Sequence, residues 1–496
     1  MADVAKIVTF HTDGTTVTWS PQSTVVSPPK NDSTLPAVPP KTTPSPATKS
    51  NIGINLEPIS YYMGERPFND LAKTMSPLLC KKIFTWDDGP PITSFDKNGW
   101  PTAIPEGCFV ASVIDLKKGH RNTDYSFYSP NGDVVCDNQS ATGVFKKTTD
   151  EQRVLVRINK PISFWSFKES TNKSSQTFAE PFIERNKKYS VLRFMDWAKI
   201  NYDRDVTWES RVSKDWYTQG GKEVAIEYMI ELCNATNTSP WYCVHHKADD
   251  NFVRQAAQLF KKDFKANKPV YLEYSNEVWN SLFPQFEFCR SRSPKTSSPL
   301  EFAITRTTQI AKIFREEGVN IICVLGAQSV GWGIMDWVLK DVSIPADIDA
   351  FAIAPYFGYQ IPDNAKKSVD LILDECDKNI SSVGANLQQW MNIANKFKKK
   401  IVGYEAGQHI CPFPYEHGNQ SVIDNYIAAN RHPRMYDLYR KYLKLWDSLT
   451  NKSLLCMFNS SQPFSKWGSW GLQEYESQPM ESAPKFRAVM DHLANK

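Results

Sequence analysis

Residues 270–280 have the sequence VYLEYSNEVWN, and residues 401–409 have the sequence IVGYEAGQH. Each stretch begins with a short, mostly apolar run and ends in polar residues that include a glutamate, Glu277 in the first and Glu405 in the second. A short continuous apolar run is typical of a parallel strand that is buried on both faces. The two stretches therefore predict buried strands whose carboxyl ends carry an acidic side chain.

Six further runs of the same kind extend this pattern along the chain. They are NIGINLEPIS (51–60), SVLRFMDW (190–197), PWYCVHH (240–246), NIICVLGAQ (320–328), IDAFAIAPYF (348–357) and LLCMFNSS (454–461). Amphipathic stretches of helical length lie between most of the runs: EVAIEYMIELCNAT (223–236), NFVRQAAQLFKKDF (251–264), EFAITRTTQIAKIFREEG (301–318), 365–398 and 426–449. Eight strands alternating with helices predict an α/β fold, a (β/α)8 TIM barrel. An open doubly wound sheet is the alternative, and it is disfavoured because no GxGxxG follows the first run.

The barrel pattern is interrupted once and is preceded by an unrelated stretch. Residues 82–188 contain short apolar runs separated by turn residues at spacings near 8 to 12, which predicts an inserted β-sandwich-like domain between the first two barrel strands. The predicted barrel then comprises residues 51–81 and 189–496. Residues 1–20 predict a β-hairpin around an Asp-Gly pair, and residues 21–50, rich in Pro, Ser and Thr, predict a linker. An isolated hairpin is marginally stable, so we expect it to dock on the barrel or on a partner.

The composition is that of a folded protein and excludes several classes. Hydrophobic residues make up 41% of the 496 residues and charged residues 23%, which argues against global disorder. A formal net charge of +4 on a chain of this length does not demand nucleic acid or an anionic membrane as partner. The ten cysteines form no CxxC and are expected to be buried thiols. The 15 Trp and 20 Tyr residues offer flat rings with polar edges, which suit stacking on sugars as well as core packing.

Two features of the sequence point to different compartments for the protein. The first residues, MADVAKIVTFHTDG, lack the pattern of a signal peptide, and no apolar stretch is long enough to predict a membrane span. Nine Asn-x-Ser/Thr sites would suit an exported chain, although chance could supply many of them. We expect action outside the cell or on a cell wall, with release by lysis or packaging in a virus particle as the proposed route.

Two carboxylates stand at the positions where a barrel places its chemistry, which is the carboxyl end of the strands. Glu277 ends the fourth predicted strand and Glu405 ends the seventh, so the two side chains can face each other across the barrel mouth. Cleavage of a glycosidic bond needs one carboxyl group to protonate the leaving oxygen and another to attack or to activate water. The pair therefore indicates a glycosidase, with Glu277 and Glu405 as catalytic residues.

These stretches, together with RFMDW (193–197), WESR (208–211), AIAPYFG (352–358) and GSWGLQEY (468–475), resemble the clan A glycoside hydrolases. Within that clan the chain is most similar to bacterial proteins described as cellulose-binding or cellulase-like, over nearly everything from Asn51 onward. The resemblance implies retention of anomeric configuration through a covalent glycosyl-enzyme, with the two carboxyl groups about 5 to 5.5 Å apart. It does not specify the sugar, the linkage, or endo versus exo action.

The resemblance also implies a role for individual residues. Glu277 matches the general acid/base and Glu405 the nucleophile, and Asn276 matches the residue that holds the sugar 2-hydroxyl. Arg193 matches an arginine beside the nucleophile, with a structural ion pair to a carboxylate such as Asp196 as the alternative. Tyr356 matches a tyrosine that orients the nucleophile, and it could also be an ordinary rim residue.

Three histidines near predicted strand ends raise the question of a metal. His245 and His246 end the third strand, where one could bind a sugar hydroxyl while the other packs. A zinc site with His409 is disfavoured because adjacent residues of a strand point to opposite faces, and no HExxH motif accompanies them. We therefore predict no catalytic metal and no cofactor.

Tryptophans after the last strand are candidates for sugar stacking. Trp467 and Trp470 lie in a Gly-rich stretch that follows the eighth run. Trp279 and Trp332 compete for the same role, and each of them could equally belong to the core.

Three functions remain open at this point. The first is a retaining β-glycosidase acting on a cell-wall or extracellular polysaccharide. The second is a non-catalytic carbohydrate-binding or structural protein of a surface or virion, built on the same barrel. The third is a barrel enzyme of another class, such as an aldolase or a phosphate-binding isomerase, but neither a strand-end lysine nor a Gly-rich phosphate loop is present.

Overall fold

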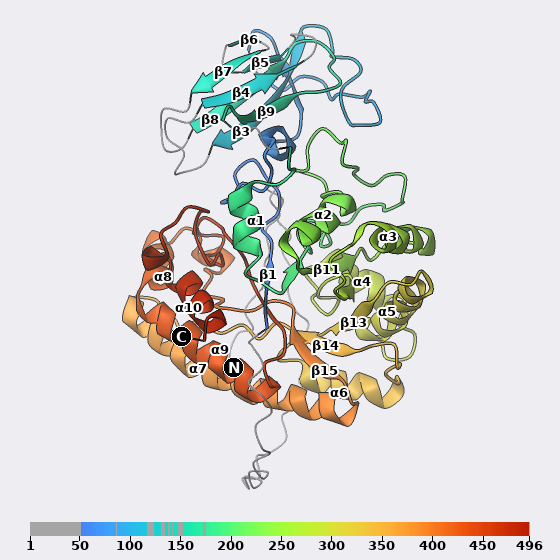
Figure 1. The fold of residues 1–496 in the computed structure, drawn as a ribbon. Helices are drawn as coiled ribbons and strands as arrows, with labels where there is room; N and C mark the ends of the chain where they lie inside the picture. The colour runs from blue at the N-terminus through green and yellow to red at the C-terminus, as the bar shows by residue number, and fades with distance from the viewer. Residues whose placement is uncertain are drawn as a thin grey trace.

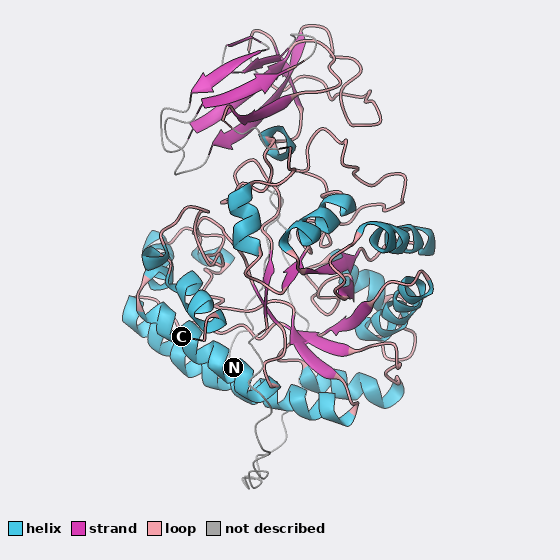
Figure 2. Cartoon of the chain, in the orientation of Figure 1, coloured by secondary structure: helices cyan, strands magenta, loops and turns pink. Residues whose placement is uncertain are grey.

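The computed structural model describes residues 51–495, apart from residues 86, 117–123, 130–133, 137–138, 141, 147–151 and 172–174. The hairpin and the linker predicted for residues 1–50 lie outside the described residues. In the described part, a barrel with peripheral helices carries a separate group of strands at one end (Figures 1 and 2).

Eight parallel strands close into a barrel in the order β1-β10-β11-β12-β13-β14-β15-β16, which confirms the predicted fold class. The strands are β1 (Ile52–Asn55), β10 (Val191–Arg193), β11 (Ser239–Val244), β12 (Val270–Tyr274), β13 (Ile321–Gly326), β14 (Ala350–Ile353), β15 (Lys400–Gly403) and β16 (Leu455–Met457). Closure is made by β16 pairing with β1, where Leu455 lies opposite Ile52. Most strand residues are buried, as expected for strands that face side chains inside and helices outside.

Helices cover the outside of the barrel and hide its strands from solvent (Figure 2). They are α1 (Glu180–Asn186), α2 (Ile226–Thr236), α3 (Asp250–Asp263), α4 (Pro284–Arg290), α5 (Pro299–Glu316), α6 (Trp332–Asp341), α7 (Val369–Lys396), α8 (Gln420–Arg431), α9 (Arg434–Thr450) and α10 (Pro484–Leu493). The helical pattern at 426–449 is divided between α8 and α9. Pro433 lies at the break, and the helix is interrupted there because proline lacks the backbone N–H that a continuous helix would need.

Antiparallel strands are inserted between β1 and β10, in the loop that leaves the carboxyl end of the first barrel strand. They are β2 (Leu79–Lys82), β3 (Cys108–Leu116), β4 (Asp124–Tyr128), β5 (Val134–Cys136), β6 (Gln139–Ser140), β7 (Thr142–Lys146), β8 (Gln152–Ile158) and β9 (Ser166–Glu169). One sheet has the order β2-β3-β8-β5-β6 and the other β7-β4-β9. Residues of both sheets, among them Ile114, Val156 and Phe167, share one hydrophobic core. The insert therefore has its own core, at the top of Figure 1.

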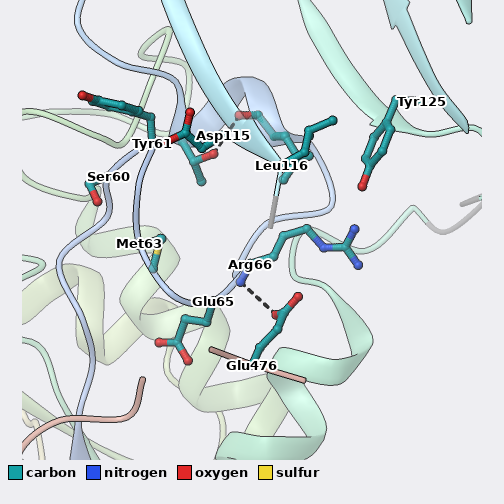
Figure 3. A pocket seen from close by; sticks show the side chains of 11 residues that line it. Ser60, Tyr61, Met63, Glu65, Arg66, Asp115, Leu116, Tyr125 and Glu476 are labelled. Atoms are coloured by element: carbon teal, nitrogen blue, oxygen red, sulfur yellow. Dashed lines mark hydrogen bonds between the residues drawn. The ribbon is translucent and has the colours of Figure 1, made fainter. Parts of the chain in front are cut away.

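Charged and polar contacts join the insert to the barrel where the loop after β1 passes between them (Figure 3). The Asp115 amide of β3 donates to the Tyr61 carbonyl at 3.3 Å. Arg66 binds Glu476 through its backbone amide at 2.9 Å, and its guanidinium pairs with Glu169 of β9. The insert is thus fixed to the face of the barrel on which β1 ends. Among the described helices, none is long and apolar enough to cross a bilayer.

Candidate active site

Arg193, at the carboxyl end of β10, is the centre of the polar network inside the barrel mouth. Its guanidinium is fully buried and donates to Glu405 at 2.8 Å, to Glu273 at 2.9 and 3.2 Å, to Asn276 at 2.8 Å and to Asn55 at 3.0 Å. A buried cation is tolerated only when its donors are paired, and here two carboxylates and two amides pair them. Arg193 thus contacts the predicted nucleophile and also forms the alternative structural ion pair, with Glu273 as its carboxylate partner instead of Asp196.

Glu273 and Asn55 complete this network, although the sequence analysis assigned neither a role. Glu273 is buried on β12 and accepts from the Trp241 indole at 2.8 Å and from the Cys243 thiol at 3.3 Å. Asn55, at the end of β1, donates to the Tyr404 and Met457 carbonyls. A glutamate inside the apolar run VYLEY was the available signal, because an acidic residue is rarely fully buried without a partner.

Glu405 lies two residues beyond β15, and both of its carboxylate oxygens accept hydrogen bonds. Its Oε1 accepts from Arg193, and its Oε2 accepts from the Tyr356 hydroxyl at 2.9 Å. Burial raises the pKa of Glu405, whereas the positive charge of Arg193 and the Tyr356 hydrogen bond oppose that rise. The predicted contacts of Arg193 and Tyr356 with this carboxylate are thus present in the structure.

Asn276 and Glu277 occupy a tight turn directly after β12. Ser275 and Glu277 have left-handed backbones, with φ of 61° and 40°, a conformation that costs free energy for residues with a side chain. The Ser275 amide donates to the Val244 carbonyl at 2.7 Å, and Gln285 of α4 donates to the Asn276 carbonyl at 2.7 Å. These bonds hold the turn so that Asn276 binds Arg193 while the next side chain faces the mouth.

Glu277 has neutral partners. The Tyr404 hydroxyl donates to its Oε1 at 2.8 Å, and the Asn280 amide donates to its Oε2 at 2.9 Å. Burial, aided by the negative charge of Glu405, raises the pKa of Glu277 to about 7. Tyr404, which directly precedes Glu405 in the chain, donates to Glu277, so the two carboxylates belong to one site. Glu277 has neutral partners and Glu405 a cationic one, and a proton donor and an anionic nucleophile require surroundings that differ in this way.

Asp196 is a fourth carboxylic acid at the mouth, besides Glu273, Glu277 and Glu405. It follows β10 by three residues, in the turn that leads to the buried Trp197. Burial and the charge of Glu405 raise the pKa of Asp196 to about 6, although Lys199 and Arg193 lower it. From the sequence, this residue was predicted only as a possible ion-pair partner of Arg193.

His245 and His246 lie together rather than on opposite faces, so that part of the prediction is wrong. Their rings stack with centroids 4.2 Å apart, because β11 ends at Val244 and the strand alternation no longer applies. Nε2 of His245 contacts the Tyr202 carbonyl at 2.8 Å, and Nε2 of His246 lies 3.9 Å from Asp203. Burial lowers the pKa of His245 to about 4 and of His246 to about 3.

The histidine pair therefore contacts the loop at 201–203 and acts at most indirectly on the carboxylates. Asn201 of this loop accepts from the Asn276 amide at 3.1 Å and from Gln285 at 2.8 Å, which connects it to the turn after β12. Neither His245 nor His246, both of which the structure describes, is hydrogen-bonded to Glu277 or Glu405. Within the described residues, no group of three or more His, Cys, Asp or Glu side chains is arranged to hold a metal ion.

The tryptophan candidates occupy different places. Trp470 is half-buried beside His409 and Phe458, with ring centroids 5.8 and 6.1 Å away, and Phe458 lies 6.4 Å from Tyr356. Trp467 points outward and packs edge-on against His417, with centroids 4.8 Å apart. The structure thus brings Trp470 next to the tyrosine that binds Glu405 and leaves Trp467 further out.

The two competing tryptophans are elsewhere. Trp279 is half-buried with an indole N–H that has no hydrogen-bond partner, and Trp332 is partly exposed at the start of α6. Neither takes part in the aromatic contacts around Trp470.

Comparison with known proteins gives distant structural similarity only. No protein-family model matches the chain, and no curated protein matches it in sequence. A family 51 arabinofuranosidase from Xanthomonas axonopodis pv. citri matches 59% of this chain and 62% of its own length, with 11% identity and a TM-score of 0.38. Xylanase 10C from Cellvibrio japonicus, a mutant solved with xylopentaose, matches 85% of this chain and 98% of its own length, with 10% identity and a TM-score of 0.39. An endo-β-1,4-mannanase of family 26 from Cellulomonas fimi matches 62% of this chain, with 12% identity and a TM-score of 0.32.

Proposed function

We propose that the protein is a retaining glycoside hydrolase that cleaves β-glycosidic bonds of a cell-wall or extracellular polysaccharide. The observation that carries this proposal is the unequal pair of carboxylates at one rim. Glu405 is bound to a buried cation, and Glu277 is bound to neutral groups with its pKa raised to about 7. The similarity of the sequence to cellulase-like proteins of clan A is part of the same proposal, as is action outside the cell.

The first chemical step uses each carboxyl group once. The Glu405 carboxylate attacks the anomeric carbon, the bond from that carbon to the leaving oxygen breaks, and the Glu277 proton passes to the leaving oxygen. Arg193 and Tyr356 favour the ionised form of Glu405 and fix its orientation. Asn276, which Arg193 fixes, is positioned to hold the 2-hydroxyl of the sugar.

The second step needs Glu277 to accept a proton. Once Glu405 is esterified its negative charge is gone, and that charge is one of the two effects that raise the pKa of Glu277. The pKa of Glu277 therefore falls in the intermediate, and its carboxylate can take a proton from water. The water oxygen attacks the anomeric carbon, the ester bond to Glu405 breaks, and both groups return to their starting states.

The test measures hydrolysis and the anomeric configuration of the first product. Purified protein is incubated with 4-nitrophenyl β-glycosides and with glucans, mannans, xylans and galactans, and the first anomer formed is identified by proton NMR. We expect cleavage of at least one substrate with release of the β-anomer. An α-anomer as first product would contradict the two-step mechanism. Binding to a polysaccharide without any cleavage would support the non-catalytic carbohydrate-binding alternative.

A further inference from the structure

A line of aromatic rings leads from Glu405 to the surface of the protein. Tyr356, whose hydroxyl binds Glu405, lies with its ring centroid 5.2 Å from that of His409. His409 in turn lies 5.3 Å from Tyr359, which is 41% exposed. The planes of Tyr356 and His409 meet at 78° and those of Tyr359 and His409 at 81°, so both pairs are packed edge to face.

Tyr359 is placed at the rim by an extension of two barrel strands. Beyond the ends of β14 and β15, Phe357 and Gln408 form a further parallel bridge, and the His409 amide donates to the Phe357 carbonyl at 2.7 Å. The Gly358 amide is bound to Asn379 of α7 at 2.8 Å. The backbone on both sides of the Tyr359 and His409 rings is therefore fixed.

Trp470 forms the other side of this wall and is held rigidly. The Ser469 carbonyl accepts from Gln408 at 2.9 Å and from the buried Lys485, which also binds Asn430 at 2.9 Å. Gly468 has a φ of +127°, and a Cβ atom there would lie 2.1 Å from the Trp470 ring. A platform that is already ordered loses little conformational entropy when it binds a ligand.

The wall has the chemistry of a sugar-binding surface rather than of a core. Tyr356, His409 and Trp470 are only partly covered, and Tyr359 is exposed, although large aromatic rings in a core would be hidden from solvent. A phenol, an imidazole and an indole each combine an apolar face with a polar edge. A pyranose ring likewise has apolar C–H faces and hydroxyl groups along its edge.

The position of the wall sets the direction in which a bound chain would run. The rings belong to the loops after β14, β15 and β16, whereas Glu277 follows β12. A sugar with its anomeric carbon at Glu405 has its leaving group on the side of Glu277. The wall reaches Glu405 through Tyr356, whereas Glu277 is held by Tyr404 and Asn280, so the neighbour on the non-reducing side is assigned to the wall.

We propose that Tyr359, His409 and Trp470 form a second sugar-binding subsite, which holds the next sugar unit on the non-reducing side of the bond that is cleaved. This inference rests on the proposed glycosidase function and specifies its substrate as a chain of at least two sugars on that side. The protein then acts on oligosaccharides and polysaccharides in preference to simple monosaccharide glycosides.

The test compares short and longer substrates of the same sugar. The probes are the 4-nitrophenyl β-glucoside, mannoside and xyloside and the matching β-1,4-linked biosides. Wild-type protein is expected to have a higher kcat/KM on one bioside than on its monoside. Tyr359→Ala is expected to lower kcat/KM on that bioside by about fivefold to tenfold, mainly through KM, with the monoside rate unchanged. Tyr359→Phe, which keeps the ring, is expected to retain most of the bioside activity.

A matched control is available on the insert. Tyr128 of β4 is 50% exposed and contacts the ring of Phe164, so Tyr128→Ala removes a similar tyrosine far from β14 and is expected to change neither rate. Equal losses on monoside and bioside, or no loss in Tyr359→Ala, would overturn the subsite.

Failure of the proposed function gives a different result. In that case wild-type protein cleaves none of these glycosides, and the subsite is tested by affinity electrophoresis in gels that contain soluble glucan, mannan or xylan. Weaker retardation of Tyr359→Ala than of wild type would support the subsite. Equal migration of the two proteins in every gel would overturn it.

Discussion

Glu277 and Glu405 stand at the same rim in different surroundings. Glu405 accepts from a guanidinium at 2.8 Å and from a phenol at 2.9 Å. Glu277 accepts from a phenol at 2.8 Å and from an amide at 2.9 Å, with no cation bonded to it. The bond from Arg193 therefore favours the anion of Glu405, whereas Glu277 has only neutral donors to oppose the effect of its burial.

The two sides also differ in how the backbone presents the acid. Glu405 follows the straight end of β15, whereas Glu277 follows β12 in a turn with two left-handed residues. Adjacent residues join the two sides, because Tyr404 donates to Glu277 while its ring lies 4.9 Å from the Arg193 guanidinium. The contrast between the carboxylates is thus built into one connected network, and substitutions on each side should have distinct effects.

The largest effect is expected from Glu405→Gln. Removal of the nucleophile should lower kcat on a 4-nitrophenyl glycoside by at least about 10⁴-fold, since no glycosyl-enzyme can form. Circular dichroism should show an unchanged fold, because the amide oxygen can still accept from Arg193 while the amide NH2 donates to the Tyr356 hydroxyl oxygen. Retention of activity within tenfold of wild type would remove Glu405 from the mechanism.

Glu277→Gln gives the matching experiment on the other side of the pair. With a good leaving group such as 4-nitrophenol, the first step needs little protonation and the second step becomes limiting. Added azide, which attacks without losing a proton, should therefore raise the rate of Glu277→Gln and yield a β-glycosyl azide. Azide should not rescue Glu405→Gln in this way, and rescue of both variants alike would contradict the assignment of roles.

An intermediate effect is expected when each phenol is removed in turn. Tyr356→Phe takes a donor from Glu405 and should move the acid limb of the kcat/KM profile to higher pH. Tyr404→Phe takes a donor from Glu277 and should move the alkaline limb to higher pH, while its ring stays against Arg193. A hydrogen bond to a charged group stabilises it by about 1.5 to 3 kcal/mol, so each shift should be about one to two pH units. The two roles would have to be exchanged if each variant moved the opposite limb.

The barrel could be predicted from the sequence because its signal is local. Each strand is a short apolar run, and the eight runs lie where the structure has its eight strands. Helix boundaries were less certain, as the division of α8 from α9 at Pro433 shows. Helix α6 was not predicted, because its run from Trp332 mixes exposed and buried apolar residues and lacks a polar face.

The candidate site was predictable only where a residue ends a strand. Glu277, Glu405, Arg193 and Tyr356 were found by position and resemblance, and they lie together in the network. Their supporting contacts join residues far apart in the chain, such as Asn55 with Tyr404, and no local pattern reveals such pairs.

The histidine pair shows a second limit of sequence reasoning. His245 and His246 were expected to alternate as strand residues do. The strand ends two residues earlier, at Val244, and boundaries of that kind are the least certain part of a sequence-based prediction.

The smallest effect concerns stability, and it has a definite sign. Burial and the charge of Glu405 raise the pKa of Glu277 from an ordinary 4.5 to about 7, so the folded protein binds this proton more tightly than the unfolded chain does. The free energy of unfolding therefore falls as pH rises from about 4.5 to 7 and stays reduced above that. Glu277→Gln has no proton to lose, so it should become more stable than wild type as pH increases from 5 to 8.

The expected gain is on the order of 3 kcal/mol at pH 8, since each pKa unit corresponds to about 1.4 kcal/mol. Urea unfolding gives the free energy of unfolding of both proteins at pH 5 and at pH 8. The change with pH in the difference between Glu277→Gln and wild type measures the gain, and any pH-independent cost of the substitution cancels. Glu287→Gln is the control, because this exposed residue of α4 has its pKa lowered by a hydrogen bond from Arg290 and should give a small trend of opposite sign. If the stability difference between Glu277→Gln and wild type were the same at both pH values, Glu277 would not hold a proton more tightly in the folded protein, and the contrast with Glu405 would lose its electrostatic basis.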